Sequence, residues 1–386
     1  MDFDLSPEHK MLSDVVYKFM LKEIAPRAEE IDREEKLPEG IWSKLGELGV
    51  LGVTIPEEYG GGGFDLLAAV LVLEQMARIC PALALSCGAH AILCTDTLFR
   101  HATENQRRKY LPSLCSGQMV GALGLTEPNA GSDAAGISTT AGKNGREYIL
   151  NGAKMFITNG PIADVLVVYA KTDKEKGAKG ISAFIVEKGF PGFSVSRQLE
   201  KMGHRGSPTG ELVFEDCRVP PENLLGEENR GVAVMMSGLD RERAALSGLA
   251  LGIARQALDL SLQYARERRQ FGQPIGNFQL IQGKLADMYT HLEAARLLAY
   301  KAAITADQKE RGGKGTTMHK LAAAAILFAG EMATRAALEA VQIHGGYGYM
   351  LEFPVNRLYR DVKLYEIGAG TSEIRRLLIA RELLNE

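Results

Sequence analysis

The C-terminal segment Leu364–Arg376 carries backbone chemistry rather than a reactive side chain. Gly368 and Gly370 interrupt two apolar helical runs, and glycine permits positive φ angles and the close approach of a backbone to a ligand. A hydroxyl residue at position 371 or 372 can cap the helix that follows, and Glu373 suits its positive end. The segment therefore reads as a loop that exposes main-chain N–H groups, although an ordinary helix–helix connection has the same composition.

Two earlier loops add hydroxyl groups and an aromatic face. Leu123–Asp133 is rich in Thr, Ser and Gly, and Phe156–Gly160 sets a phenyl ring beside the Thr158 hydroxyl. Together these groups suit a flat heterocycle with polar edges. Surface turns and helix caps use the same residue types, so the loops alone leave both interpretations open.

Several common chemistries have no support in the sequence. We find no G-x-G-x-x-G after a strand, no Walker loop, no H-E-x-x-H and no G-x-S-x-G. The seven histidines are scattered without ligand spacing, and the five cysteines contain no C-x-x-C pair. Cys80, Cys87 and Cys94 recur every seven residues in an Ala/Leu-rich stretch, which favours buried thiols over metal ligands. We predict no metal site.

Charge and composition also limit the partners. The 386 residues include 45 basic and 48 acidic side chains, well interspersed, so no nucleic-acid or anionic-membrane partner is indicated. The acidic N-terminus resembles neither a signal peptide nor a transit peptide, and no later apolar run is expected to span a membrane. We expect a cytoplasmic location for a bacterial chain, or the mitochondrial matrix for a processed eukaryotic one.

Apolar periodicity divides the chain into three units: residues 1–118 with helical spacing, 119–230 with strand-like runs, and 231–386 with long helices. The predicted strands are 165–170, 181–186 and 211–214, and Asn151-Gly152 predicts a tight hairpin turn. The predicted long helices are 231–269, 278–311, 315–344 and 372–384. This order predicts an α+β fold, mainly α, with an N-terminal helical domain, a central β-domain and a C-terminal four-helix bundle.

Four separated motifs, together with the C-terminal loop, give the chain a specific resemblance. It resembles the FAD-dependent acyl-CoA dehydrogenases over essentially its whole length. The motifs are Leu125-Thr126-Glu127-Pro128-Asn129-Ala130-Gly131-Ser132-Asp133, Phe156-Ile157-Thr158-Asn159-Gly160, Arg268-Arg269-Gln270-Phe271-Gly272 and Gln342-Ile343-His344-Gly345-Gly346-Tyr347-Gly348.

The resemblance implies three groups of FAD-binding residues. One group would contact the flavin of the same subunit, with Ser132 also near CoA: Leu123, Leu125, Thr126, Ser132, Phe156 and Thr158. A second would reach the FAD of a partner subunit: Arg268, Phe271, Gln279, Gln342, Gly345 and Gly346. Thr371 and Glu373 would lie beside FAD. Many members carry tryptophan where this chain has Phe156, which keeps an aromatic face against the isoalloxazine.

The resemblance also implies a catalytic base. Medium- and short-chain members carry a glutamate directly before the Gly-Thr of the C-terminal loop, where this chain has Ala369. The isovaleryl-CoA and long-chain branches place the base early in the first long bundle helix, at the position of Glu242. Taken alone, a glutamate between two arginines would be read as a surface ion pair. With alanine at 369, Glu242 is the implied base.

Substrate contacts follow from the same resemblance. Asp240 and Arg243 would hold CoA, Gly370 would line the site, and the N–H of Ala369 would polarise the thioester carbonyl together with a flavin ribityl hydroxyl. Gly368 stands where many straight-chain members have tyrosine, which widens the acyl pocket. We therefore expect a short branched acyl-CoA of the isovaleryl type, an electron-transfer flavoprotein as acceptor, and a homotetramer built as a dimer of dimers.

Three alternatives remain open at this stage. Asp96 lies in an apolar run and could serve an alicyclic acyl-CoA as a second base, although surface exposure is the expected state of an aspartate. A flavin-dependent oxidase or monooxygenase could use the same fold. A non-enzymatic binding protein is the third alternative.

Overall fold

The structure is a computed structural model that describes residues 4–310 and 318–385. Its N-terminal helices are α1 Pro7–Phe19, α2 Ala28–Glu34, α3 Ile41–Glu47, α4 Leu66–Ile79, α5 Pro81–Gly88, α6 Thr97–His101 and α7 Glu104–Cys115. The C-terminal helices are α8 Gly231–Glu267, α9 Gln279–Glu310, α10 Met318–His344, α11 Pro354–Val362 and α12 Ser372–Leu384. Local sequence explains several starts, such as the capping box in which Thr103 and Gln106 satisfy the first N–H groups of α7.

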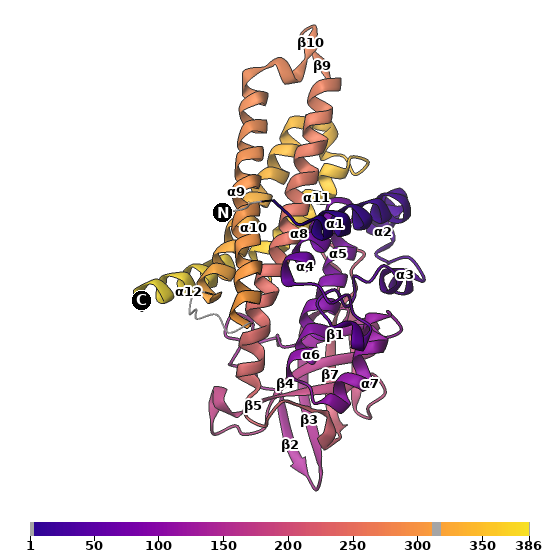
Figure 1. Ribbon diagram of the computed structural model, residues 1–386, viewed down its shortest axis with the longest axis vertical. Coiled ribbons are helices and arrows are strands. Elements are labelled where there is room, and N and C mark those ends of the chain that lie inside the picture. Colours follow the sequence, from indigo (N-terminus) through magenta and orange to yellow (C-terminus); the bar gives the residue numbers. More distant parts are fainter. Residues whose placement is uncertain (1–3, 311–317, 386) are drawn as a thin grey trace.

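An eight-stranded sheet follows the N-terminal helices in the chain and lies at the lower end of the molecule in Figure 1. Its strands are β1 Gly121–Gly124, β2 Thr140–Asn144, β3 Glu147–Thr158, β4 Val165–Lys171, β5 Ile181–Glu187, β6 Phe193–Gln198, β7 Thr209–Val219 and β8 Leu224–Leu225. The order is β6-β7-β3-β2-β4-β5-β8, and β1 pairs with β4 in parallel. Two short strands, β9 Arg269–Gln270 and β10 Gln273–Pro274, join α8 to α9. All three predicted strands are present, each longer than expected.

The predicted hairpin turn at Asn151-Gly152 is wrong. Both residues lie inside β3, where the register against β7 shifts between Leu150 and Gly152, so the pair forms a β-bulge. Gly152 has φ +148°, and a Cβ there would lie 2.5 Å from the Thr139 hydroxyl. The β2–β3 hairpin turns instead at an earlier Asn-Gly pair, where Gly145 has φ +61°.

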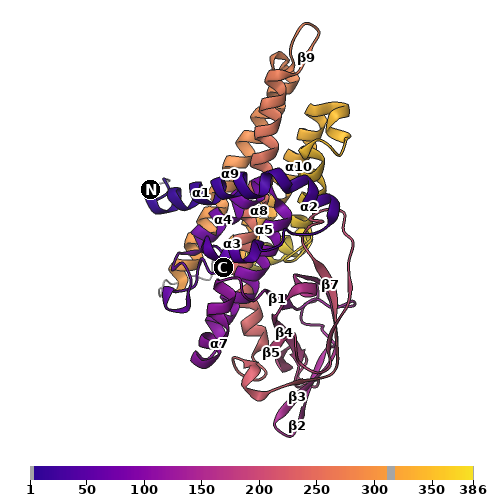
Figure 2. The same cartoon turned by 90° about the vertical axis from the view of Figure 1, so that its right-hand side faces the viewer.

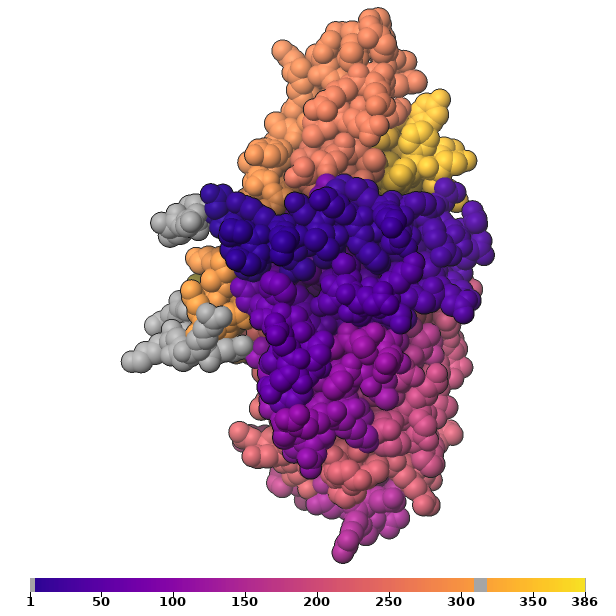
Figure 3. Space-filling model, turned by 45° about the vertical axis from the view of Figure 1, so that its right-hand side comes forward, coloured from indigo at the N-terminus to yellow at the C-terminus, as the bar shows by residue number. Residues whose placement is uncertain are grey.

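The long helices α8, α9 and α10 run side by side along the long axis of the molecule, and α4 packs across α8 (Figures 1 and 2). The predicted starts and ends of these helices are confirmed to within a few residues, although positions 311–317 lie outside the described residues. The fourth predicted helix, α12, packs on α10 but lies across its axis in Figure 1. The tip of the α8–α9 hairpin projects beyond the N-terminal helices in Figure 3.

One hydrophobic cluster joins the two helical parts of the chain. It contains Leu71 of α4, Leu249 of α8 and Ala333 of α10, all buried. Small residues allow the close packing, since a Cβ on Gly248 would lie 2.4 Å from the Val70 carbonyl oxygen. The thiols of the five cysteines are free and buried, which confirms the core interpretation of Cys80, Cys87 and Cys94.

Two helical stretches are long and apolar enough to cross a membrane, contrary to the sequence-based expectation. They are residues 81–101 and 318–349. Of their most apolar windows, 89% and 61% are buried inside the fold, respectively. Packing in the interior therefore accounts for much of their apolar composition.

Candidate active site

The loop between α11 and α12 turns sharply at two residues. Ala369 has φ +57° and Gly370 has φ +95°. A left-handed alanine costs about 1–2 kcal/mol, so the surrounding contacts must hold it in place. Thr371 then caps α12, as predicted, because its Oγ accepts from the N–H of Ile374 over 3.4 Å.

Two buried arginines hold the carbonyl groups of this loop. Arg243 Nε donates to Ala369 O over 3.2 Å. Arg375 donates through one terminal nitrogen to Tyr365 O over 2.6 Å and through the other to Gly368 O. Among the described residues, the N–H groups of Ala369 and Gly370 have no hydrogen-bond partner. The loop therefore offers two free backbone donors, as its glycines suggested.

Glu242 lies beside this loop on α8 and is buried. No hydrogen bond or ion pair holds its carboxylate among the described residues. Burial raises the pKa of Glu242 to about 7, against the opposing charges of Arg243 and Arg375. A carboxyl group with a pKa near neutrality can remove a proton at physiological pH. The surface ion pair that the sequence alone suggests is wrong.

Glu242 also lies near the sheet. Tyr169 of β4 is buried, and burial together with the charge of Glu242 raises the pKa of its phenol. Leu239, one turn before Glu242, packs against the same hydrophobic cluster as Leu123 and Leu125. The helical turn that precedes the predicted base and the predicted flavin loop thus pack on one hydrophobic cluster.

A buried ion pair fixes the predicted flavin loop against β3. Lys154 Nζ lies 2.8 Å from Glu127 and donates to Leu125 O over 3.2 Å. Burial would raise the pKa of Glu127, but Lys154 and bonds from Ser138 and Thr139 outweigh it and lower that pKa to about 2. The loop geometry is therefore set by a carboxylate that remains ionised. Sequence reasoning assigned no role to this pair.

Phe156 projects from the sheet next to that loop. A register shift between Lys154 and Ile157 bulges the strand, and Phe156 takes φ +63° with 67% of its surface exposed. The preceding Met155 N–H donates to Thr126 O over 2.8 Å. An exposed phenyl face thus adjoins the half-buried Thr126, an arrangement that fits a flat heterocycle such as a flavin. Ser132 lies on the exposed part of the same loop, and Thr158 follows on β3.

The residues predicted to reach the FAD of a partner subunit gather at the other end of the molecule, near the tip of α8 and α9 (Figures 1 and 2), whereas Glu373 lies in the first turn of α12. A hollow of about 510 Å³ there is lined by Tyr264, Arg268, Gln270, Ile275, Ile343, His344, Gly345, Gly346, Tyr347 and Met350. The guanidinium of Arg268 in this hollow suits a phosphate, and the stacked rings of Tyr264 and His344 suit a flat base. Phe271, Gln279 and Gln342 are exposed nearby on the same end.

A second hollow, of about 340 Å³, opens beside the first turns of α8. It is lined by Arg100, His101, Ser237, Asp240, Arg241, Ala306 and Met318. Asp240 is buried and lies 2.6 Å from the Nδ1 of His319, a partner that the sequence analysis missed. Of the two predicted CoA-binding residues, Asp240 lines this hollow, whereas Arg243 contacts the Ala369 loop.

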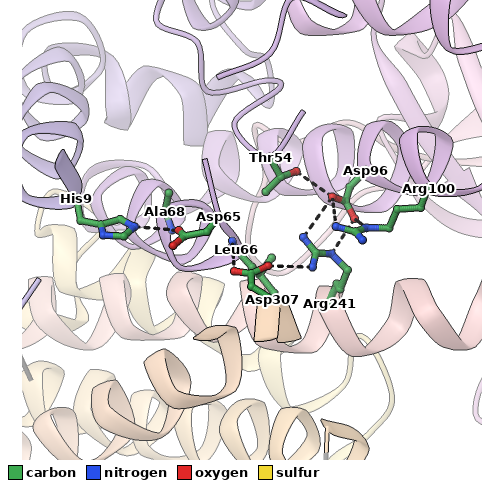
Figure 4. Close-up of polar contacts among 9 residues, drawn as sticks. All are labelled: His9, Thr54, Asp65, Leu66, Ala68, Asp96, Arg100, Arg241 and Asp307. Carbon is green, nitrogen blue, oxygen red and sulfur yellow. Dashed lines mark hydrogen bonds and ion pairs between the residues drawn. The ribbon is translucent and has the colours of Figure 1, made fainter. Parts of the chain in front are cut away.

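Asp96 is buried, with 1% of its surface exposed, so the expected surface position is wrong. Figure 4 shows its carboxylate between Arg100, at 2.6 Å, and Arg241, at 2.9 Å, with a further bond from Thr54. Burial opposes its ionisation, but the two guanidinium groups outweigh burial and lower the pKa of Asp96. A carboxylate held in this way is a weak base, which weighs against a second proton abstraction by Asp96.

The network around Asp96 reaches both helical parts of the chain (Figure 4). Arg241 also contacts Asp307 of α9 over 3.4 Å, and Asp307 accepts from the N–H of Leu66 at the start of α4 over 2.7 Å. These bonds anchor the turn of α8 that carries Glu242. Sequence periodicity could not reveal them, because the partners lie far apart in the chain.

Family comparisons agree with this geometry along the chain. Family models match at residues 6–118 (acyl-CoA dehydrogenase, N-terminal domain), 122–217 (middle domain) and 229–384 (C-terminal domain). The curated relative "isovaleryl-CoA dehydrogenase, mitochondrial" from Pongo abelii is 52% identical, and the match covers 98% of this chain and 89% of that protein.

Solved structures extend the comparison. The butyryl-CoA dehydrogenase of Megasphaera elsdenii matches with a TM-score of 0.95 and 43% identity, covering 100% of both chains. A structure of PigA with FAD and proline matches with a TM-score of 0.94 and 32% identity, covering 99% of both. The predicted fold is confirmed by these matches, and the chain belongs to the acyl-CoA dehydrogenases, a family of FAD-dependent enzymes that act on acyl-CoA.

Proposed function

We propose that this enzyme introduces an α,β double bond into a short branched acyl-CoA of the isovaleryl type, with Glu242 as the base. The observation that carries the proposal is the buried Glu242 carboxyl, whose pKa is raised to about 7, beside a loop that has alanine at position 369. Because Ala369 cannot accept a proton, the reaction needs a carboxylate from another element, and α8 supplies one.

The chain's own residues account for proton removal and carbonyl polarisation. Glu242 takes the α-proton, the C–H electron pair becomes the new carbon–carbon double bond, and the β-hydrogen leaves as hydride. Bound FAD supplies the acceptor for that hydride. The free N–H of Ala369 donates to the thioester oxygen as enolate character develops. Thr126, Phe156 and Thr158 would hold the flavin, with Leu123, Leu125, Ser132, Thr371 and Glu373 around it.

Space at Gly368 supports a branched acyl group. A Cβ built on Gly368 would approach no atom closer than the Leu364 carbonyl oxygen at 3.5 Å, so its own packing does not require glycine. The absent side chain instead leaves volume next to Ala369. The 52% identity to an isovaleryl-CoA dehydrogenase supports the same substrate class.

The hollow beside α8 supports the position of the CoA arm. Asp240 can accept from an amide of the pantetheine, and Ser237 and His101, 2.8 Å apart, add polar groups at the rim. Arg243, which the resemblance assigns to CoA, is directed toward Ala369 O, so we assign it to the loop as well.

The separation of the FAD-binding residues supports assembly from several copies. Arg268, Gly345 and Gly346 line a hollow at the end of the molecule away from the sheet (Figure 1). A cofactor shared between two copies would bring both groups together. Phe271 is 93% exposed and Leu280 84% exposed at the same tip, which favours a covering partner. We propose the homotetramer built as a dimer of dimers, with an electron-transfer flavoprotein as acceptor.

Anaerobic bleaching of the flavin by a panel of acyl-CoAs tests this function. We expect isovaleryl-CoA and other short branched substrates to bleach the holoenzyme faster than straight-chain or alicyclic ones, and reduced enzyme to pass electrons to an electron-transfer flavoprotein. Bleaching by none of the panel would contradict dehydrogenation. Rapid reoxidation by oxygen would instead indicate an oxidase on the same fold.

The rate of this bleaching should depend on pH. Glu242 acts as a base only when deprotonated, and its pKa is about 7. We therefore expect the rate constant of flavin reduction to rise with pH through about 7 and then level off. Stopped-flow reduction at saturating substrate measures this profile. A rate that falls as pH rises through this range would contradict the assignment of Glu242.

A further inference from the structure

We propose that Arg375 is a positioning residue that aims the Ala369 N–H at the substrate carbonyl, an inference that rests on the proposed function. Arg375 lies on α12 with 1% of its surface exposed. It lines neither hollow, and its terminal nitrogens donate to carbonyl groups of the Ala369 loop.

One peptide unit connects the Arg375 hydrogen bond to the Ala369 donor. Gly368 O and Ala369 N–H belong to the same trans peptide, in which the C=O and N–H bonds point in opposite directions. Arg375 holds Gly368 O toward the buried side of the loop. The Ala369 N–H must then point away from Arg375, which agrees with its lack of a partner among the described residues.

The forked guanidinium of Arg375 holds the turn at two carbonyl groups. Its two terminal nitrogens reach Tyr365 O and Gly368 O, which fixes the turn at both ends. Inside the turn, the N–H groups of Ile367 and Gly368 both donate to Leu364 O, at 3.0 and 2.8 Å. The peptide between Gly368 and Ala369 comes directly after these two N–H groups, and its carbonyl oxygen accepts from Arg375, so it has little freedom to rotate.

The positive charge of Arg375 also acts on the predicted base. Arg375 and Arg243 both lie near Glu242, and the positive charge of Arg375 lowers the pKa of Glu242 against the effect of burial. Burial lowers the pKa of Arg375 itself to about 10, so it stays protonated at neutral pH. Arg375 thus fixes the direction of the Ala369 N–H and also lowers the pKa of Glu242 against the effect of burial.

The test compares two neighbouring arginines on α12. Arg375→Met removes the fork, Arg375→Lys keeps the charge without the fork, and Arg376→Met removes a 53% exposed side chain that pairs with Glu331. We expect kcat to fall about 100-fold in Arg375→Met and less in Arg375→Lys, with KM nearly unchanged. Arg376→Met should match the wild type.

A spectroscopic readout separates positioning from stability. The probe is 3-methylbut-2-enoyl-CoA, ¹³C-labelled at the thioester carbonyl, bound to each holoenzyme and examined by isotope-edited infrared spectroscopy. We expect the carbonyl stretch to lie at lower frequency in the wild type and in Arg376→Met than in Arg375→Met. An unchanged frequency in Arg375→Met would overturn the proposal, whatever happens to kcat.

Two further outcomes concern variants that do not fold and a wild type that does not bind a thioester. If both Arg375 variants fail to fold while Arg376→Met folds, Arg375 is a stability residue and the proposal is overturned. If the wild type binds no thioester, the proposed function fails, and crystal structures of wild type and Arg375→Lys still test the inference. We expect the 368–369 peptide to rotate in the variant, and an unrotated peptide would contradict the proposal.

Discussion

Replacing Glu242 with glutamine is expected to leave a yellow, FAD-bound protein that substrate no longer bleaches. Glutamine keeps the size of the side chain but cannot take the α-proton, and alanine at position 369 cannot take it either. A positioned general base contributes up to roughly 10⁴-fold, so reduction should fall below detection. Anaerobic absorbance at the flavin band after addition of isovaleryl-CoA measures the effect.

The matched control for this variant is Glu366→Gln. Glu366 belongs to the same loop region but pairs with Lys363 at 2.7 Å, and it should bleach like the wild type. Persistent bleaching in Glu242→Gln would refute the assignment of the base.

Stability offers an independent check on the same residue. Folding raises the pKa of Glu242 from 4.5 to about 7. Between these two pH values the folded protein binds more protons than the unfolded chain, so its stability falls as pH rises from 4.5 to about 7. Glutamine does not ionise, so a variant with glutamine at this position does not lose stability in this way. We expect the melting temperature of substrate-free Glu242→Gln to exceed that of the wild type at pH 8, and the difference to shrink toward pH 4.5.

Replacing Glu127 with glutamine is expected to be strongly destabilising and to weaken FAD binding. The change leaves Lys154, fully buried, without a counter-charge, and breaking a buried ion pair in this way costs about 3–5 kcal/mol. Glutamine keeps one acceptor oxygen, so the loop that carries Leu125 and Thr126 would also lose its bond from the N–H of either Ser138 or Thr139. Denaturant unfolding of the apoprotein and FAD titration by fluorescence measure both effects.

Two comparisons make the Glu127 result specific. Glu211→Gln breaks a pair with Arg197 whose guanidinium is largely exposed, and it should cost less than about 1 kcal/mol. The double variant Glu127→Gln with Lys154→Met removes the buried cation and should recover part of the loss. Equal losses in Glu127→Gln and Glu211→Gln would show that the buried pair has no special role.

Helix periodicity predicted α8, α9 and α10 almost to their ends, because each buries a continuous apolar face. The turn was mispredicted for a local reason. The chain contains three Asn-Gly pairs, beginning at residues 144, 151 and 159, and only pairing with β7 distinguishes the bulge at Gly152 from the turn at Gly145. Local sequence carries no information about that third strand.

Some features of the candidate site could also be predicted from local sequence, whereas others depend on distant residues. Backbone donors could be expected from Gly368 and Gly370, since glycine marks where a chain can turn sharply. Burial of Asp96 depends on Arg241, a residue 145 positions away, so sequence spacing gave no hint of it. The burial of Arg375 could have been predicted from the sequence. It lies three residues from both Ser372 and Leu378, which are buried, and this spacing places all three on the inner face of α12.

The hydrophobic cluster that joins α4 to α8 and α10 has a consequence for how the protein unfolds. Because Leu71, Leu249 and Ala333 share one core, the N-terminal helices and the long C-terminal helices are thermodynamically a single unit, whatever boundary the sequence suggests between them. A fragment ending at residue 118 would expose the apolar face of α4 to water. Melting should therefore be cooperative across both helical parts, with the base-bearing helix lost in the same transition as its N-terminal cover.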